Sequence, residues 1–436
     1  MTVNPGTTRR HAHATFRFLP VVSVRRMGKG AGMDDGSLTI SRRTALAGGA
    51  AGIGALLAAS VVPKAKAVRT GGIEATDLEV VTVTPTSVTF GFASYTAPHP
   101  AYGPLRPTVP TLGEVAMAPA DDPIAANDPV GSQALPGSAG SWIRPGMPDL
   151  PVVKASESET GFHLVTVDGL EPGREYVFEC RCDGIPATPG LMTTNLPGTP
   201  EISGRVTTLT PPPGEHVTTI AILNDTHIGE EKHGLILGDP WGEEFVPRQT
   251  MWRTDVGGLR VIGIDSSMLD ESGGRIEEAQ FEALEAELAA APARPTLLMA
   301  HHPVTVEAAF TNVGTPAFTL NLDHSDRLQR MLAATPGAFL MAAGHTHRAR
   351  RTAPDAASNV DFVEFGSAAG YPGGYTLVHL HTGGYQVNFH RTGSPETLRW
   401  SSRSRWAMYG LNPEYTLGAT EHRNYVVHRD LSGLAR

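Results

Sequence analysis

Cysteine is scarce in this sequence. The 436 residues include two cysteines, Cys180 and Cys182, in a segment that alternates with the period of two expected of a strand. This alternation places both on one face with Tyr176 and Phe178. A redox pair or a metal site is one interpretation, but a disulfide between strand positions i and i+2 would be strained. We therefore interpret both cysteines as small apolar residues of a sandwich core.

The sequence also lacks a concentration of positive charge. The formal net charge is −9 at pH 7, and no basic stripe is visible in the body of the chain, so nucleic acid is not an expected partner. Glycine (48) and proline (35) are plentiful. This composition is typical of a soluble, loop-rich globular protein and does not suit a coiled coil or a membrane bundle. The length allows two or three domains.

Residues 1–67 do not have the pattern of a folded domain. Arg42 and Arg43 precede an Ala/Gly-rich apolar run that reaches Val62, and Ala65-Lys66-Ala67 is a small-x-small cleavage pattern. This arrangement resembles a twin-arginine export signal. We expect export to an extracytoplasmic location, secreted or at the cell surface, with no stable membrane insertion after cleavage near Ala67. A retained anchor is the alternative, although the run is barely long enough to span a bilayer.

Residues 68–208 have the pattern of an all-β domain, with short alternating runs bounded by turn residues. The sharpest segment, Val165–Tyr176, places a leucine and a Pro-Gly pair before a tyrosine that enters a strand. It resembles the tyrosine corner of a fibronectin type III sandwich. Residues 209–216 contain three consecutive prolines, Pro211–Pro213, and are interpreted as a stiff linker.

Residues 217–410 change to longer apolar runs, as in strands that are buried on both faces. Four such runs are separated by predicted helices over 277–290 and 327–334, and a predicted hairpin follows at 375–389. We predict a layered α/β domain of mixed sheets with flanking helices. Residues 411–436 are set apart as a C-terminal tail. The four runs begin at Val217, Leu259, Thr296 and Ala338.

Each of the four runs ends in polar residues. Asp225-x-His227 follows the first run, and Asp265-Ser-Ser follows the second. His301-His302 follows the third, and Gly344-His345-x-His347 follows the fourth. Because open α/β sheets bind ligands at the carboxyl ends of their strands, these side chains are expected to converge. One carboxylate with several imidazoles suits Zn, Mn or Fe, which can lower the pKa of bound water and clamp a phosphoryl group.

With these motifs, residues 217–391 resemble the calcineurin-like metallophosphoesterases, and the preceding sandwich is similar to the N-terminal domain of purple acid phosphatase-like members. The resemblance implies hydrolysis of a small phosphomono- or diester by metal-bound hydroxide at a dinuclear centre. It also implies that Asp225, His227 and His347 hold one metal, and that His301 and His345 hold the other.

Two motifs of the family are absent. The first is Gly-Asp-x-x-Asp, whose first aspartate would bridge the metals, and the second is Gly-Asn-His. Neither motif follows His227, and the stretch from there to Leu259 contains no asparagine. Gly238-Asp239 is too close to His227 for a crossover and a strand. We interpret residues 239–241 as a seam where roughly 60 to 90 residues, two βα units, are missing. We therefore expect at most one tightly bound ion and impaired hydrolysis.

Two other functions are compatible with the same residues. One is a non-catalytic secreted binding protein on a metallophosphoesterase scaffold, in which the sandwich would bind a cell-surface or polymer partner. The other is a mononuclear metal protein that hydrolyses a different substrate.

Overall fold

The computed structural model describes most of the chain after the predicted export signal. The described residues are 69–70, 72–97, 107–125, 147, 149–189, 199–226, 250–268, 271–355, 359–405 and 413–435. Three expectations lie outside them: the export signal in residues 1–67, the proposed ligand His227, and the seam at 239–241. No helix in the described ranges is both long and apolar enough to cross a membrane.

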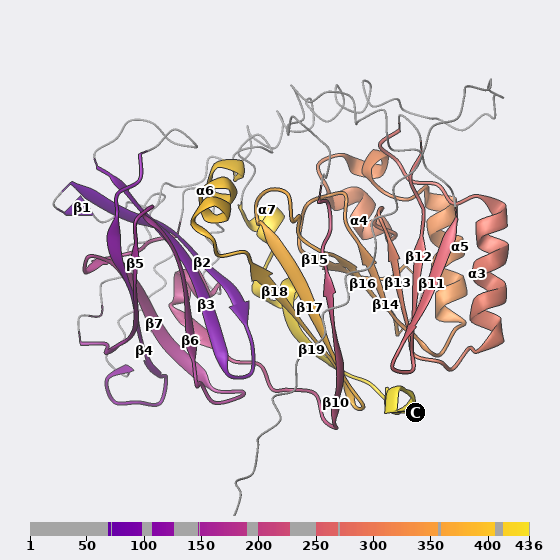
Figure 1. Ribbon diagram of the computed structural model, residues 1–436, viewed down its shortest axis with the longest axis horizontal. Coiled ribbons are helices and arrows are strands. Elements are labelled where there is room, and N and C mark those ends of the chain that lie inside the picture. Colours follow the sequence, from indigo (N-terminus) through magenta and orange to yellow (C-terminus); the bar gives the residue numbers. More distant parts are fainter. Residues whose placement is uncertain are drawn as a thin grey trace, which may run out of the picture.

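The N-terminal region consists of two antiparallel sheets (Figure 1, left). The first has the order β1-β2-β3-β6, formed by Arg69–Thr70, Ile73–Val83, Ser87–Thr96 and Phe162–Asp168. The second has the order β5-β4-β7-β8, with β9 also paired to β7; its strands are β4 Thr111–Pro119, β5 Val152–Ser158, β7 Glu175–Cys182, β8 Ile185–Pro186 and β9 Arg205–Thr207. A short helix, α2 (Pro200–Ser203), precedes β9. The sheets pack face to face, with the rings of Phe90 and Phe178 4.6 Å apart between centroids.

Two details of this region confirm expectations from the sequence. Cys180 and Cys182 are free thiols, both fully buried in the core between the sheets. Tyr176 is 5% exposed, and its hydroxyl accepts a 2.9 Å hydrogen bond from the backbone N–H of Glu171. This bond closes the turn before β7, as the tyrosine-corner pattern predicted.

The second region contains a mixed sheet of six strands with the order β11-β12-β13-β14-β16-β15. Strands β12, β13, β14 and β16 are parallel, and β11 and β15 are antiparallel edges. The strands span β11 Met251–Val256, β12 Leu259–Ile264, β13 Thr296–Ala300, β14 Ala338–Ala343, β15 Arg350–Thr352 and β16 Asp361–Glu364. The parallel strands β12, β13 and β14 place the ends of three predicted motifs at one edge of the sheet.

Helices α3 (Glu278–Ala290) and α5 (Leu322–Ala333) cover one face of the mixed sheet (Figure 1). Phe281, Leu284 and Leu288 of α3 are buried, as their helical spacing predicted. Helix α5 begins five residues before the predicted start, because the Asn321 side chain accepts hydrogen bonds from the first free backbone N–H groups. The shorter α4 (Val306–Thr311) and η2 (Thr315–Phe318) follow His301-His302.

The other face of the mixed sheet packs on an antiparallel sheet with the order β10-β17-β18-β19. Its strands are β10 His216–Ile222, β17 Gly374–His381, β18 Gly384–Arg391 and β19 Asn424–His428. Strands β17 and β18 form the predicted hairpin. The segment set apart as a C-terminal tail contains β19, which pairs with β18. Short helices complete this region: α6 Pro395–Ser404, α7 Pro413–Leu417, α8 Thr420–Arg423 and η3 Ser432–Ala435.

The prediction that the first apolar run is buried on both faces was wrong. This run is β10, an edge strand of the antiparallel sheet, and it does not belong to the sheet that holds β12, β13 and β14. Ile220 and Ile222 point toward the core, whereas Thr219 and Ala221 are exposed and Leu223 is 53% exposed. The continuous apolar run therefore gave no indication that one face of this strand is exposed to solvent.

The two regions are joined by more than the proline-rich linker. Glu79 of β2, 3% exposed, forms ion pairs of 2.7 and 2.8 Å with Arg391 and Arg405 and accepts a 2.7 Å hydrogen bond from Tyr371. Burial acts to raise the pKa of Glu79, but the charges of Arg405 and Arg391 outweigh it and hold the pKa below its usual value. The interface is thus a buried polar network.

Candidate metal centre

The candidate ligands lie where strands from both sheets of the second region end. Strand β13 leads into His301, and β14 leads into His345 and His347. Asp225 arrives from β10, in the other sheet. The side chain of its neighbour Asn224 donates a 2.7 Å hydrogen bond to the Ala343 carbonyl at the end of β14, which draws the end of β10 to the edge of the mixed sheet.

Asp225 is the centre of this cluster. Its Oδ1 accepts a 2.8 Å hydrogen bond from the backbone N–H of His345. The same oxygen lies 3.7 Å from Nδ1 of His301 and 3.9 Å from Nε2 of His347. The structure therefore brings together Asp225, His301, His345 and His347; the fifth expected ligand, His227, is outside the described residues.

The backbone at three of these residues is unusual. Asp225, His345 and His347 have φ angles of 50°, 67° and 56°, in the left-handed region that non-glycine residues rarely occupy. Such conformations cost free energy and persist where the surroundings impose them, often at functional sites. Here they turn the chain sharply directly after β10 and β14, so that neighbouring side chains face one centre.

Gly344 shows why the motif before His345 contains glycine. A Cβ atom at this position would lie 2.7 Å from Oδ2 of Asp225, closer than non-bonded atoms approach. The carboxylate therefore rests directly on the Gly344 backbone, and any side chain here would displace it.

The chemistry of the cluster fits a metal ion. Asp225 Oδ2 and His345 Nε2 are buried and have no hydrogen-bond partner, which is costly for polar atoms unless an ion or water satisfies them. Burial, followed by the neighbouring imidazoles of His301, His302 and His347, lowers the pKa of His345 well below its usual value. The ring is then neutral near pH 7, as a metal ligand must be.

The separations fit one ion better than two. Two ligand atoms about 2.1 Å from one tetrahedral ion lie roughly 3.4 Å apart. The 3.7 and 3.9 Å separations from Asp225 Oδ1 to His301 and His347 are close to that value. By contrast, Nε2 of His301 and Nδ1 of His345 form a 2.9 Å hydrogen bond with each other. The pair expected to hold the second metal is thus engaged in an internal contact.

His302 is close to the cluster but differs in its hydrogen bonding. One of its ring nitrogens lies within 4.8 Å of a ring nitrogen of His301 and of one of His345. Its Nε2 donates to the Ser272 carbonyl at 3.1 Å, so Nδ1 accepts from the Ser266 hydroxyl at 2.9 Å. Because both nitrogens are satisfied, we assign His302 a packing role. Gly274 makes room for it, since a Cβ there would lie 2.6 Å from the ring.

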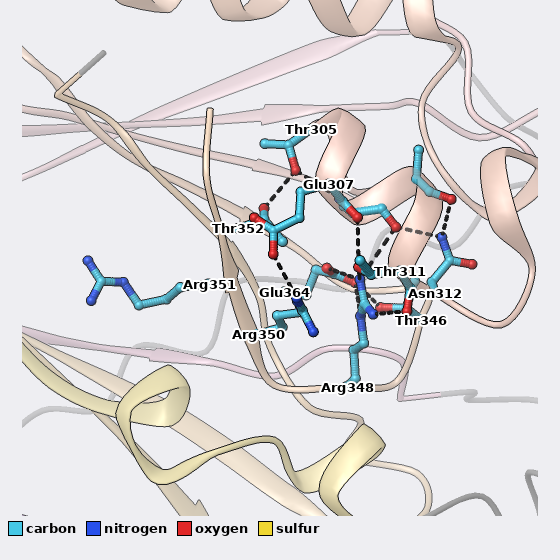
Figure 2. A network of polar contacts seen from close by, with 12 residues as sticks. Thr305, Glu307, Thr311, Asn312, Thr346, Arg348, Arg350, Arg351, Thr352 and Glu364 are labelled. Atoms are coloured by element: carbon cyan, nitrogen blue, oxygen red, sulfur yellow. Dashed lines mark hydrogen bonds and ion pairs between the residues drawn. The ribbon is translucent and has the colours of Figure 1, made fainter. Parts of the chain in front are cut away.

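Sequence reasoning missed the residues that surround the ligand turn. Arg348 and Glu364 are each 1% exposed and form an ion pair (Figure 2). Glu364 also accepts a hydrogen bond from Thr346, the residue between His345 and His347. The ring of Phe318 lies edge-on to that of His345, with 5.2 Å between centroids. The position of Arg348 immediately after the histidine motif was the available signal. Its partner Glu364, sixteen positions later, could not be identified from spacing.

Comparison with protein-family models and with curated proteins finds no match for this chain. Among solved structures, a dimetal phosphatase from Danio rerio is 13% identical over 33% of this chain, with a TM-score of 0.27; the match spans 58% of that phosphatase. PhoD is 10% identical over 71% of this chain and 85% of its own length, with a TM-score of 0.25. The sensor domain of the anti-sigma factor RsgI4 from Pseudobacteroides cellulosolvens is 10% identical over 31% of this chain and 96% of its own, with a TM-score of 0.16. Because these similarities are low, function is inferred from the side chains of the site.

Proposed function

We propose that this chain is an exported metal-dependent phosphoesterase that acts on a small phosphomono- or diester, with a catalytic site that retains one ion and has lost the other. The observation that carries the proposal is the convergence of Asp225, His301, His345 and His347, with two buried polar atoms of this cluster that lack partners. A carboxylate among imidazoles is a ligand set for Zn, Mn or Fe.

The residues divide into ligands and neighbours. Asp225, His301 and His347 would hold the ion, and His227 would add a fourth ligand from beyond the described residues. When bound, such an ion lowers the pKa of coordinated water and polarises a phosphoryl oxygen. Neutral His345 holds Asp225 through its backbone N–H.

The proposed loss of two βα units is supported by the state of β10. The outward residues Thr219 and Ala221 are exposed, and Leu223 is 53% exposed. Among the described residues β10 pairs with β17 alone. Missing units that once followed Asp225 and His227 would have covered this edge and face. They would also have carried the bridging aspartate and the Asn-His pair.

The proposal is tested by metal content and hydrolysis. We expect at most one equivalent of tightly bound transition metal per chain in purified protein. We also expect aryl phosphate hydrolysis at least about 10³-fold slower than that of a relative with all motifs, or about 4 kcal/mol of transition-state stabilisation. Two tightly bound equivalents with rapid hydrolysis would refute the proposed loss. No bound metal and no hydrolysis would favour the non-catalytic binding protein.

Export is a separate part of the proposal. It rests on Arg42-Arg43 and the small-residue pattern at Ala65–Ala67. With both arginines changed to lysine, the precursor should remain in the cytoplasm, detected by fractionation and immunoblotting. Export of that variant at the normal level would contradict this part alone. We also propose that residues 68–208 are a fibronectin type III-like sandwich, because the Tyr176–Glu171 hydrogen bond matches a tyrosine corner.

A further inference from the structure

A buried ion pair lies next to the histidine turn, the segment His345–His347 that carries the proposed ligand His347. The side chains of Arg348 and Glu364 are 1% and 2% exposed. Nε of Arg348 donates to Oε2 of Glu364 at 2.8 Å, and Nη2 donates to Oε1 at 2.7 Å. This forked geometry fixes the orientation of the guanidinium and cannot be reproduced by a lysine.

The same pair joins three segments of the site (Figure 2). Thr346, between His345 and the proposed ligand His347, donates its hydroxyl proton to Glu364. Arg348 also donates to the carbonyl of Thr311 at 2.7 Å and to its hydroxyl at 3.1 Å. Thr311 is the last residue of α4, the helix that follows His301. The histidine turn, β16 and α4 are thereby held to one another.

Helix α4 is held at its other end by the strand that follows the histidine turn. The hydroxyl of Thr305, which caps α4, donates to the hydroxyl of Thr352 at 2.8 Å. Glu307 forms a 2.7 Å ion pair with Arg350. The segment after His301 and the segment after His347 are thus connected at several points, and Arg348 is the more deeply buried of the two arginines involved.

Stability alone gives little reason for an ion pair at this position. A buried ion pair is often no more stabilising than apolar residues of the same volume, because both charges lose their hydration. What the pair provides is a fixed geometry. It lies beside two residues with left-handed φ angles, His345 and His347, whose conformation the surroundings must impose.

We propose that Arg348 and Glu364 are positioning residues that set the separation between His301 and the His345–His347 turn and so determine metal affinity. The inference rests on the metal site of the proposed function. Hydrogen-bonded neighbours of metal ligands commonly change affinity by about 10- to 100-fold when they are altered. We expect a change in metal affinity of the same size when Arg348 or Glu364 is altered.

The test is titration of the metal-free protein with Co²⁺, followed by calorimetry and by the visible absorption spectrum of the bound ion. Arg348→Lys and Glu364→Gln should weaken Co²⁺ binding about 10- to 100-fold and change the spectrum. Thr346→Val, a milder change that keeps the ion pair, should shift the spectrum in the same direction with a smaller loss of affinity. Folding of each variant is checked by circular dichroism, and Thr346→Val serves where the others fail to fold.

The matched control is Arg260→Lys. Arg260 is also fully buried, but it lies at the amino end of β12, where it donates to Thr296 at 2.9 Å and pairs with Glu287 at 3.2 Å. This variant should lower stability while Co²⁺ affinity and spectrum stay those of the unaltered protein. If the unaltered protein binds no Co²⁺, the metal site itself is refuted. If the unaltered protein binds Co²⁺, and the Thr346→Val and Arg348→Lys variants fold and match its affinity and spectrum, the positioning role alone is refuted.

Discussion

Acidification should destabilise the N-terminal sheets through one buried histidine. His163 of β6 is 4% exposed. Its Nε2 lies 2.9 Å from the hydroxyl of Thr111, and its ring stacks on Phe92 with 4.9 Å between centroids. Burial lowers the pKa of His163 to about 4, against a smaller opposing effect of Asp183. The folded protein therefore keeps this ring neutral at pH values where an unfolded chain would protonate it.

The sign and size of the effect follow from this difference in pKa. An unfolded histidine titrates near 6.5, so between about pH 6.5 and 4 the unfolded state binds more protons and stability falls as the pH falls. Between pH 7 and pH 5, a shift from 6.5 to about 4 corresponds to a loss of about 2 kcal/mol. Above pH 7 both states are neutral at this position, and His163 contributes no pH dependence.

The assay is urea unfolding at pH 7 and pH 5, for the unaltered protein and for His163→Phe. Phenylalanine keeps the stacking on Phe92, and the Thr111 hydroxyl keeps its 2.8 Å contact with Ser94. Both proteins contain the other histidines, so the difference between their pH effects isolates His163. The variant should lose about 2 kcal/mol less than the unaltered protein. Equal losses in the two proteins would refute the reasoning.

Three substitutions test other contacts. Tyr176→Phe removes the hydrogen bond from Glu171 and should lower the free energy of unfolding by about 1 kcal/mol in urea titration; an unchanged midpoint would contradict this. Gly344→Ala should displace Asp225 and so weaken Co²⁺ binding at least about tenfold. The control is Gly273→Ala, whose Cβ would meet only backbone oxygens at 3.5 Å and beyond; this variant should bind Co²⁺ as the unaltered protein does. Glu79→Gln leaves Arg391 and Arg405 buried with less opposing charge, so it should lower the free energy of unfolding by about 3–5 kcal/mol, measured by thermal unfolding. The matched control is Glu278→Gln, which removes the charge from an exposed ion pair with Arg327 and should leave the unfolding midpoint unchanged.

The elements that the sequence predicted well are those whose burial follows a simple period. Strands β12, β13 and β14 are short apolar runs, and α3 repeats its apolar residues at helical spacing. The positions of His301, His345 and His347 follow directly, since parallel strands end at a common edge. Tyr176 was predictable because its hydrogen bond is local, reaching back five residues.

The elements that were missed depend on contacts distant in sequence. The composition of β10 does not reveal that it pairs with β17, which begins more than 150 residues later. Through this pairing β10 joins a different sheet from β12. Strand β19 becomes part of a sheet only through β18. Aspartate and histidine are enriched among non-glycine residues with left-handed φ angles, but residue type alone does not predict this conformation at Asp225, His345 and His347. The Glu79 network joins residues more than 300 positions apart.

The described supports of the site explain how the remaining ligands can stay in place beside the proposed deletion. Asp225 is held from behind: Asn224 donates to Ala343, and the Asp225 carbonyl accepts from the N–H of Ala369. The histidine turn is held by Arg348 and Glu364. All of these bonds join residues outside 227–249, where the proposed seam lies. Loss of the bridging aspartate and the Asn-His pair would therefore remove ligands without removing the supports of those that remain, which is the physical basis for expecting one ion rather than none.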